Sequence, residues 1–400
     1  MRALEVRLGQ TRVGLLEQVE EWEYRFSFDT SYLHKPGSPV LGQLFEDRKP
    51  RDIATTGHIP IWFSHLLPQG PLRRAIARRL GVDVDDELEL LEFLGEDLPG
   101  AVVLVPGQPR LSLTPMTRRM VVPQLAQKLR FSLAGAQWKL SVRAGERGLT
   151  VPVRGETGSW IAKFHDPAFK ELPRIEYATM SWAKRVGVSL PSFRMAQVSE
   201  FVELPESIPT GDGTVFLIER FDRGPAGQRI HIEDLAQVLD RPPGEPQYSG
   251  RYEYIASVLS YIAPEEVRSY CERLVFCILC GNTDAHLKNW SLIYPDGRHP
   301  RLSPAYDLVA SVLYAPRDIT DDLALSLGGS RRFEDVRLDS FHLLARASGR
   351  SFAEVASWVR QARERVLTAW YEEGRRLPLL DWERERIEAN LARIPLVHES

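Results

Sequence analysis

Several features are scarce in this chain of 400 residues, and each scarcity excludes a class of protein. No apolar run approaches the roughly 20 residues of a membrane-spanning helix. The N-terminus has no apolar signal-peptide core. The net charge is −3, so the chain as a whole has no excess of positive charge with which to bind nucleic acid. We therefore expect a cytoplasmic protein with no membrane span.

Cysteine is also rare, and its spacing does not predict a metal site. The three cysteines are Cys271, Cys277 and Cys280. The last two have the spacing of half a zinc site, but no second pair exists, and His286 alone does not complete a tetrahedral set. We expect buried thiols on a helix in a reducing compartment.

A polar stretch that follows a strongly apolar one carries the main functional signal. Residues 274–280 are apolar enough to be buried, and they position the polar residues behind them. Asp284 and Asn289 lie five positions apart in that polar stretch, and Asp307 follows eighteen positions after Asn289. Between them, residues 290–294 and 301–302 read as two short strands around a turn at 295–297.

This spacing predicts the centre of a phosphoryl transferase. Such an enzyme needs one carboxylate that accepts the hydroxyl proton, and an amide and a second carboxylate that hold magnesium. Asp284 is the candidate catalytic base, and Asn289 and Asp307 are the candidate magnesium ligands. The order is that of protein kinases, whose catalytic Asp and Asn are also five apart. The alternative is a capped helix end followed by solvated aspartates.

Residues 159–164 predict a strand with Lys163 among apolar neighbours. Because burying an unpaired ammonium is costly, Lys163 must reach either solvent, as a lysine of an edge strand does, or an anion. Its place shortly after the loop at 131–140 favours phosphate binding, although that loop has one glycine and neither usual phosphate-loop pattern. Glu176, in a helix predicted over 172–186, is either its ion-pair partner or a solvated helix residue.

The remaining patterns describe the surroundings of these residues. Short alternating segments before residue 115 predict an antiparallel sheet. From about residue 232 onward, apolar residues recur at helical spacing, and helices are predicted over 352–373 and 381–393. We expect residues 395–400 to be frayed.

The polar stretch Gly-Asn-Thr-Asp-Ala-His-Leu-Lys-Asn-Trp-Ser at 281–291, with Leu-Ser-Pro-Ala-Tyr-Asp-Leu at 302–308, resembles the HipA family. These proteins are serine/threonine kinase toxins of bacterial toxin–antitoxin pairs. Further similarities lie in Phe-Ser-Phe-Asp, Leu-Leu-Pro-Gln-Gly and Asp-Leu-Pro-Gly-Ala, which begin at Phe26, Leu66 and Asp97. The resemblance extends to about residue 330.

The resemblance implies an α+β, two-lobed, protein-kinase-like fold in three parts. Residues 1–115 would be an extra N-terminal subdomain, which we expect to brace the kinase core. Residues 116–222 would be the β-rich N-lobe with the nucleotide loop. Residues 223–400 would be a mostly helical C-lobe with the catalytic and magnesium-binding loops.

It also implies a set of nucleotide contacts. Backbone groups near Glu219 and Phe221 would bind the adenine edge. Ser132 matches the family's autophosphorylation site, where nearly two added negative charges would repel the nucleotide phosphates and switch the kinase off. Ile232 stands where the family often has Gln, which puts one polar contact in doubt. The implied contacts are Ser132, Ala134, Gly135, Ala136, Gln137, Lys163, Glu219, Phe221 and His286.

Two side chains of the polar stretch keep alternative roles. His286 resembles a phosphate-contacting histidine of the family. By chemistry alone, it serves equally well to stabilise the loop through a hydrogen bond. Lys288 would point away from Asn289 in an extended loop, and a solvated position explains it.

The resemblance implies transfer of the γ-phosphoryl group of ATP to a protein serine or threonine, with Mg²⁺ as cofactor. It implies a toxin linked to persistence and a helix-turn-helix, HipB-like antitoxin that binds operator DNA, so that DNA contact comes through the partner. An aminoacyl-tRNA synthetase is the candidate substrate. Two alternatives are a small-molecule or lipid kinase, and a degenerate kinase that acts as a binding or corepressor subunit. The intact catalytic and magnesium-binding residues argue against the second.

Overall fold

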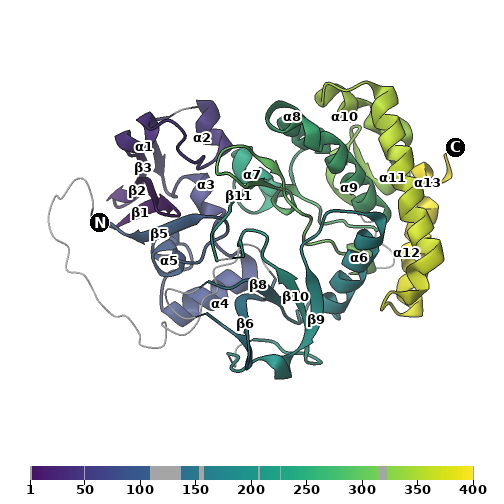
Figure 1. The fold of residues 1–400 in the computed structure, drawn as a ribbon, viewed down its shortest axis with the longest axis horizontal. Coiled ribbons are helices and arrows are strands. Elements are labelled where there is room, and N and C mark those ends of the chain that lie inside the picture. Colours follow the sequence, from purple (N-terminus) through teal and green to yellow (C-terminus); the bar gives the residue numbers. More distant parts are fainter. Residues whose placement is uncertain are drawn as a thin grey trace. The chain divides into compact units, whose positions relative to one another are not determined.

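The structure is a computed structural model, and it describes residues 2–48, 50–108, 137–152, 157–205, 208–225, 227–314 and 322–399 (Figure 1). The chain forms two compact units, each built from segments that are distant in sequence. Unit 1 comprises Met1–Asp166, Ala196–Pro243 and Ile293–Arg298, and unit 2 comprises Pro167–Met195, Gly244–Leu292 and His299–Ser400. The three-part division at 115 and 222 stays a prediction.

Unit 1 begins with an antiparallel five-stranded sheet, which confirms the sheet predicted before residue 115. Its order is β4-β3-β2-β1-β5. The strands are β1 (Ala3–Leu8), β2 (Thr11–Glu20), β3 (Glu23–Phe28), β4 (Asp52–Thr56) and β5 (Val102–Pro106). The helices between them are α1 (Thr30–His34), α2 (Gln43–Arg48), α3 (Ile61–Ser64), α4 (Gly70–Leu80) and α5 (Glu87–Leu94).

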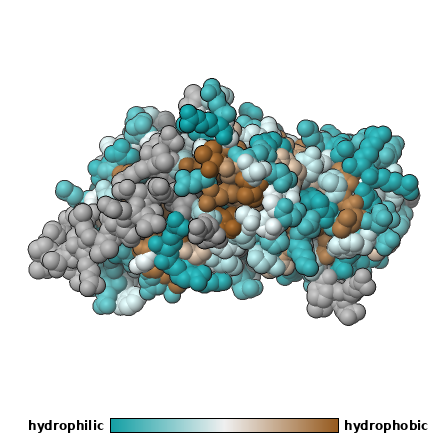
Figure 2. All heavy atoms as spheres, turned by 90° about the horizontal axis from the view of Figure 1, so that it is seen from below, coloured by the Kyte–Doolittle hydropathy of each residue, from teal (hydrophilic) through white to brown (hydrophobic). Residues whose placement is uncertain are grey.

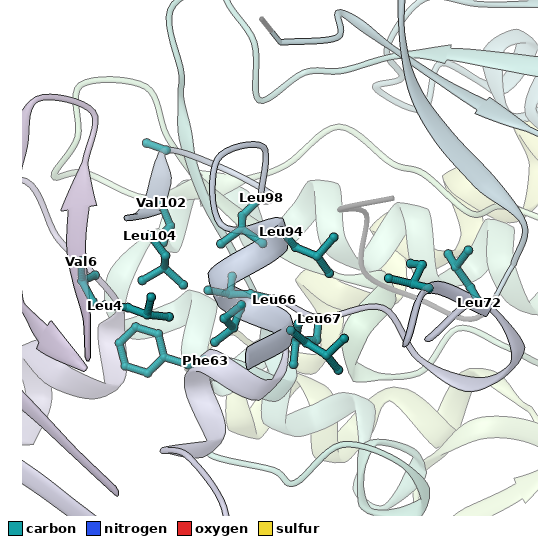
Figure 3. Close-up of a cluster of buried hydrophobic side chains, with 14 of the residues drawn as sticks. Leu4, Val6, Phe63, Leu66, Leu67, Leu72, Leu94, Leu98, Val102 and Leu104 are labelled. Atoms are coloured by element: carbon teal, nitrogen blue, oxygen red, sulfur yellow. The ribbon is translucent and has the colours of Figure 1, made fainter. Parts of the chain in front are cut away.

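Apolar side chains join this sheet to its helices. Alternating residues of β1 and β5 point toward the helices, as the period of two in a strand requires. Figure 3 shows these strand side chains beside those of α3, α5 and the loops that follow them. The buried residues labelled there include Leu4, Val6, Phe63, Leu66, Leu94, Leu98, Val102 and Leu104.

A second sheet in unit 1 has the order β7-β6-β8-β10-β9. Its strands are β6 (Lys139–Gly145), β7 (Gly148–Thr150), β8 (Trp160–Lys163), β9 (Phe193–Gln197) and β10 (Thr214–Glu219). β11 (His231–Asp234) and α7 (Leu235–Val238) follow. Because β8 is the central strand, the prediction that Lys163 could be an edge lysine is wrong.

Unit 2 is mostly helical. Its helices are α6 (Leu172–Val186), α8 (Tyr252–Ile262), α9 (Val267–Leu279), α10 (His342–Ala347), α11 (Phe352–Glu373), α12 (Asp381–Arg393) and α13 (Pro395–His398). The predicted helices at 172–186, 352–373 and 381–393 are confirmed with the same bounds. Trp182 of α6 packs against α9 and α11. Its ring centroid lies 5.4 Å from that of Phe276 in α9 and 4.6 Å from that of Trp370 in α11.

Short strands complete unit 2. β13 (Arg301–Leu302) neighbours β12 (Ser291–Tyr294), which confirms the predicted pair around the turn at 295–297. β12 begins in unit 2 and ends in unit 1. β14 (Asp322–Leu327) and β15 (Ser330–Arg332) form an antiparallel pair.

The prediction that the last residues are frayed is wrong for 395–399. Pro395 suits the first turn of α13, and the apolar Leu396 is fully buried. The Leu396 N–H donates to the carbonyl of Val336 at 2.9 Å. The Glu399 carboxylate accepts from the Leu338 N–H at 2.7 Å. Packing against residues 336–338 therefore orders this end.

The three cysteines are buried and free, as predicted. Burial raises the pKa of the Cys271 and Cys277 thiols to about 12. Within the described parts of the chain, no helix has both the length and the apolar character to cross a membrane. On the face drawn in Figure 2, hydrophilic side chains predominate and hydrophobic residues gather near the middle.

Candidate active site

Helix α9 ends at the start of the candidate catalytic loop and fixes its position. The helix is buried over Leu274–Leu279, as the sequence predicted. Gly281 then turns the chain with a φ of 73°, in the left-handed region that favours glycine. A Cβ atom at Gly281 would lie 2.5 Å from a methyl carbon of Val312. Only glycine therefore lets the loop leave the helix this close to residue 312.

Asp284 lies in this loop with its carboxylate held by neighbours. Its N–H donates to Oδ1 of Asn282 at 2.9 Å. The Tyr248 hydroxyl donates to Oδ1 of Asp284 at 3.0 Å, and Nε2 of His286 lies 3.7 Å from the same oxygen. The Asp284 side chain is 55% exposed, so an acceptor hydroxyl can reach it.

Several neighbours, including the carboxylate of Asp307, shift the pKa of Asp284. Surrounding protein atoms partly desolvate Asp284 even though half of its side chain is exposed, and this desolvation raises its pKa. His286 and the Tyr248 hydrogen bond oppose the rise, while the negative charge of Asp307 adds to it. An effect of one charge on the other requires proximity. Asp284 and Asp307 both belong to unit 2, and their joint role in one site stays a prediction.

Asn289 is tied to the same loop. Its Nδ2 donates to the backbone carbonyl of Asp284 at 2.6 Å, and its N–H donates to the carbonyl of His286 at 2.9 Å. The Oδ1 atom is the acceptor end of this amide. That oxygen is the atom a metal ion would use.

Asp307 adopts an uncommon backbone conformation. Its φ of 53° lies in the left-handed region, which is rare for residues other than glycine and recurs at functional sites. The preceding Tyr306 donates its hydroxyl to the carbonyl of Lys288 at 2.8 Å and accepts from the Ser291 hydroxyl at 2.5 Å. The segment that carries Asp307 is thereby bonded to the loop that carries Asp284.

A buried arginine supports both segments. Arg273 of α9 stacks on the Trp290 ring at 4.6 Å and donates to the carbonyl of Ser303 at 2.9 Å. Trp290 in turn donates its Nε1–H to the carbonyl of Ala285 at 3.1 Å. Sequence reasoning missed Arg273, Tyr248 and Asn282. The first two act across contacts that no local pattern reveals, whereas Asn282 two positions before Asp284 is a recognisable turn signal.

The donor atoms present fit a magnesium ion. Carboxylate and amide oxygens are the ligands Mg²⁺ takes, and in nucleotide sites it keeps waters and phosphate oxygens as the rest. Asn289 and Asp307 supply two such oxygens. In the described residues, no three His, Cys, Asp or Glu side chains form a group able to hold a metal alone. The role of Asn289 and Asp307 as magnesium ligands stays a prediction.

In unit 1, Lys163 lies buried on β8 with 2% exposure, and its Nζ lies 6.0 Å from the Phe216 ring centroid. Directly opposite it in the sheet register is Lys139 of β6, which is also buried. Opposed residues project from the same face of a sheet, so the two lysine side chains share that face. An anion beside them would be stabilised by both charges. Sequence reasoning missed Lys139, although it follows the candidate nucleotide loop directly.

The other predicted positions are placed as follows. Ser132, Ala134, Gly135 and Ala136 lie outside the described residues, and Gln137 is the first described residue after them. Glu219 ends β10 and is exposed, and Phe221 is half-buried just beyond it. Their roles in binding a nucleotide stay predictions.

His286 does stabilise the loop, because its Nδ1 accepts from the Lys288 N–H at 3.2 Å. Its phosphate contact stays a prediction. Lys288 and Glu176 are buried, so the alternatives that placed them in solvent are wrong. An ion pair between Lys163 of unit 1 and Glu176 of unit 2 stays a prediction.

Known proteins resemble the chain over nearly its whole length. The family described as HipA-like C-terminal domain matches residues 131–370, and HipA N-terminal domain matches residues 4–105. The putative kinase Y4dM of Sinorhizobium fredii is 34% identical over 408 residues, which cover 99% of this chain and 98% of that protein. The serine/threonine-protein kinase toxin HipA of Shewanella oneidensis is 24% identical over 366 residues, covering 81% and 78%.

A solved structure shares the fold. It is the HipA of Shewanella oneidensis MR-1 in a complex with HipB and operator DNA. The TM-score is 0.73 at 20% sequence identity, and the match covers 99% of this chain and 100% of that one. The α+β, kinase-like fold predicted from the sequence is confirmed.

Proposed function

The chain belongs to the HipA family of serine/threonine kinases, and we propose that it transfers the γ-phosphoryl group of ATP to a serine or threonine of a protein. The observation that carries this proposal is the arrangement of Asp284, Asn289 and Asp307. The negative charge of Asp307 contributes to the raised pKa of Asp284, and the side-chain amide of Asn289 donates to the backbone carbonyl of Asp284. These are the groups that phosphoryl transfer requires.

The loop residues then have separate tasks. Asp284, oriented by Tyr248 and by the turn at Asn282, accepts the proton of the acceptor hydroxyl. Asn289 and Asp307 would hold the magnesium ion. When bound, this ion neutralises charge on the phosphate oxygens during transfer.

Further nucleotide contacts are proposed in unit 1. Lys163 and Lys139 occupy opposed positions in the sheet, and their positive charges attract the phosphates. Backbone groups near Glu219 and Phe221 bind the adenine edge. Here the support is the buried, same-face position of the two lysines together with the family resemblance.

We propose that Ser132 is phosphorylated by the enzyme itself and that this inhibits it. The support is the resemblance of residues 131–140 to the family's nucleotide loop. A phosphate near that loop would repel the phosphates of ATP. The physiological role that fits is a toxin restrained by a small HipB-like, helix-turn-helix antitoxin. The family and the complex formed by the Shewanella protein support this partner. An aminoacyl-tRNA synthetase is the candidate substrate.

The test is incubation of the purified protein with labelled ATP and Mg²⁺, followed by mapping of the labelled site. We expect label on Ser132 that disappears in Ser132→Ala and upon removal of Mg²⁺. Protein and small-molecule acceptors should be offered side by side. Transfer to small molecules alone would replace the protein kinase by a small-molecule kinase, and ATP binding without any transfer would indicate a degenerate kinase.

A second experiment tests the partner. The protein is purified from cells that carry its native locus, under mild conditions. We expect a small, basic DNA-binding protein to co-purify in a fixed ratio. Purification of the kinase alone would contradict the proposed partner without affecting the proposed chemistry.

A further inference from the structure

A buried charge network in unit 1 connects the N-terminal matched region, residues 4–105, to the segment after β10. We call it the hinge network, and its members are Asp97, Arg220, Asp222, Arg223 and Arg229. Asp97 comes from the loop between α5 and β5, and its side chain is 0% exposed. The side chains of Arg220 and Arg223 are 1% and 2% exposed. Charges buried this deeply are retained only when they are paired.

The carboxylate of Asp97 is shared by two arginines. Its Oδ1 accepts from Nη1 of Arg220 at 3.1 Å and from Nη2 of Arg223 at 2.9 Å. Arg220 also forms a two-pronged bond with Asp222, from Nε to Oδ1 at 3.0 Å and from Nη2 to Oδ2 at 2.8 Å. Such a fork leaves the guanidinium little freedom. Asp97 is therefore one of two carboxylates that fix the plane of Arg220.

The backbone of the Asp97 loop contacts the same segment. The Gly100 N–H donates to Oδ2 of Asp222 at 2.8 Å, and Arg223 donates to the carbonyls of Leu98 and Gly100, each at 3.0 Å. A Cβ atom at Gly100 would lie 2.8 Å from the backbone nitrogen of Ile232. The loop thus lies against residues 220–232 too closely for any side chain at position 100.

Arg220 lies between the two residues whose backbone is proposed to bind adenine. Its own N–H donates to the carbonyl of Ser159 at 2.8 Å, and its Nη1 donates to the Ser141 hydroxyl at 3.1 Å. The side chain points into the protein, where it is anchored. Fixing Arg220 therefore fixes the peptide groups that join it to Glu219 and Phe221.

We propose that Asp97 is a positioning residue for nucleotide binding, which acts through Arg220 on the backbone at residues 219–221. This inference rests on the proposed function, because it assumes that ATP binds there. It gives the N-terminal region a part in substrate recognition, in addition to the bracing role expected from the sequence.

The experiment compares Asp97→Asn with the wild type. Asparagine keeps the shape and one acceptor oxygen but removes the charge that pairs with both arginines. We expect the Kd and the KM for ATP to rise about tenfold with kcat within about twofold of the wild type. We also expect the preference for ATP over GTP, measured as the ratio of kcat/KM values, to fall. A merely structural role would lower the melting temperature and leave that preference unchanged.

The matched control is Asp240→Asn, which removes the charge of another Asp–Arg pair in unit 1. Its partner Arg48 is 63% exposed, so the Kd for ATP should not change. If Asp97→Asn does not fold, the positioning role is tested with Ser141→Ala instead. That variant removes one bond to Arg220 and leaves all charges, and we expect its Kd for ATP to rise about threefold.

Binding of MgATP to the wild type distinguishes a failure of the proposed function from a failure of the positioning role of Asp97. A wild type that does not bind MgATP in a calorimetric titration would overturn the proposed function. A wild type that binds MgATP, with a folded Asp97→Asn of unchanged Kd and unchanged ATP preference, would overturn the positioning role alone. Where Asp97→Asn does not fold, an unchanged Kd for ATP in Ser141→Ala would overturn that role in the same way.

Discussion

Unit 1 contains two buried acidic clusters that differ in the charge of their partners. In the hinge network the carboxylates face guanidinium groups. In the other, the Glu233 cluster, the donors that reach the carboxylate of Glu233 from the described residues are neutral. These are the Tyr294 hydroxyl, the Trp62 Nε1–H at 3.2 Å and the Gln43 N–H at 2.8 Å.

Equal burial has opposite consequences in the two clusters. Burial alone would raise the pKa of Asp222, but the charges of Arg220 and Arg223 outweigh it and hold that pKa well below its ordinary value. In the Glu233 cluster burial dominates, and it raises the pKa of Glu233 to about 7 against the opposing hydrogen bonds. Formal charge on the neighbours decides whether a buried carboxylate ionises, and neutral hydrogen bonds do not suffice here.

Removal of a carboxylate from the hinge network should have the largest effect on stability. We expect Asp222→Asn to lower the free energy of unfolding by about 3–5 kcal/mol, because it leaves buried guanidinium charge uncompensated. Urea unfolding at pH 7 measures the loss. The control Asp240→Asn breaks an exposed pair and should cost about 0–1 kcal/mol. Equal losses in the two variants would contradict the contrast.

The pH dependence of stability should come from the Glu233 cluster. The pKa of Glu233 is about 7 in the folded chain and near 4.5 when exposed, so the folded state holds a proton that the unfolded state has released. Its contribution to stability is complete below about 4.5 and is lost as the pH rises through 7, by at most about 1.4 kcal/mol per pH unit. Urea unfolding at pH 5, 6, 7 and 8 measures the slope.

Glu233→Gln cannot ionise and should lack this slope. We expect the stability of the wild type to fall toward that of the variant as the pH rises toward 8. Curves for wild type and variant that run parallel from pH 5 to 8 would contradict the raised pKa. The contribution of Asp222 to stability depends on pH in the opposite direction. It is present above pH 3.8 and is lost as the pH falls below that value.

A pair of tyrosines compares a buried carboxylate with a half-exposed one. Tyr294 donates its hydroxyl to the buried Glu233, and Tyr248 donates to Asp284, whose side chain is 55% exposed. Tyr294→Phe should lower the free energy of unfolding by about 1–3 kcal/mol, because a buried acceptor loses a donor that water does not replace. Urea unfolding at pH 8, where Glu233 is ionised, measures this loss of stability. An unchanged free energy of unfolding at that pH would contradict the prediction.

Tyr248→Phe should have the smallest effect on stability, below about 0.5 kcal/mol, because water can reach Asp284. This variant should lose activity instead. We expect kcat to drop several-fold with the KM for ATP unchanged, since the base loses one of the bonds that orient it. An unchanged kcat would remove Tyr248 from the site.

The sequence was most informative where a feature is local. Asp284 and Asn289 are five positions apart, and the helices over 352–373 and 381–393 follow from periodicity within one segment. Contacts across long separations left no such signal. Asp97 and Arg220 are 123 positions apart, and Tyr248 lies 36 positions before Asp284. Strand order is equally hidden, which is why a lysine on the central strand could be taken for an edge residue.

The central claim is that Asp284, Asn289 and Asp307 form one phosphoryl-transfer site. The most direct measurement is transfer of labelled phosphate by Asp284→Asn and Asp307→Asn, with urea unfolding of the same samples. We predict a loss of about 10²–10⁴-fold for Asp284→Asn and at least as much for Asp307→Asn, without a shift of the unfolding midpoint. Full phosphate transfer by a well-folded double variant would contradict the account.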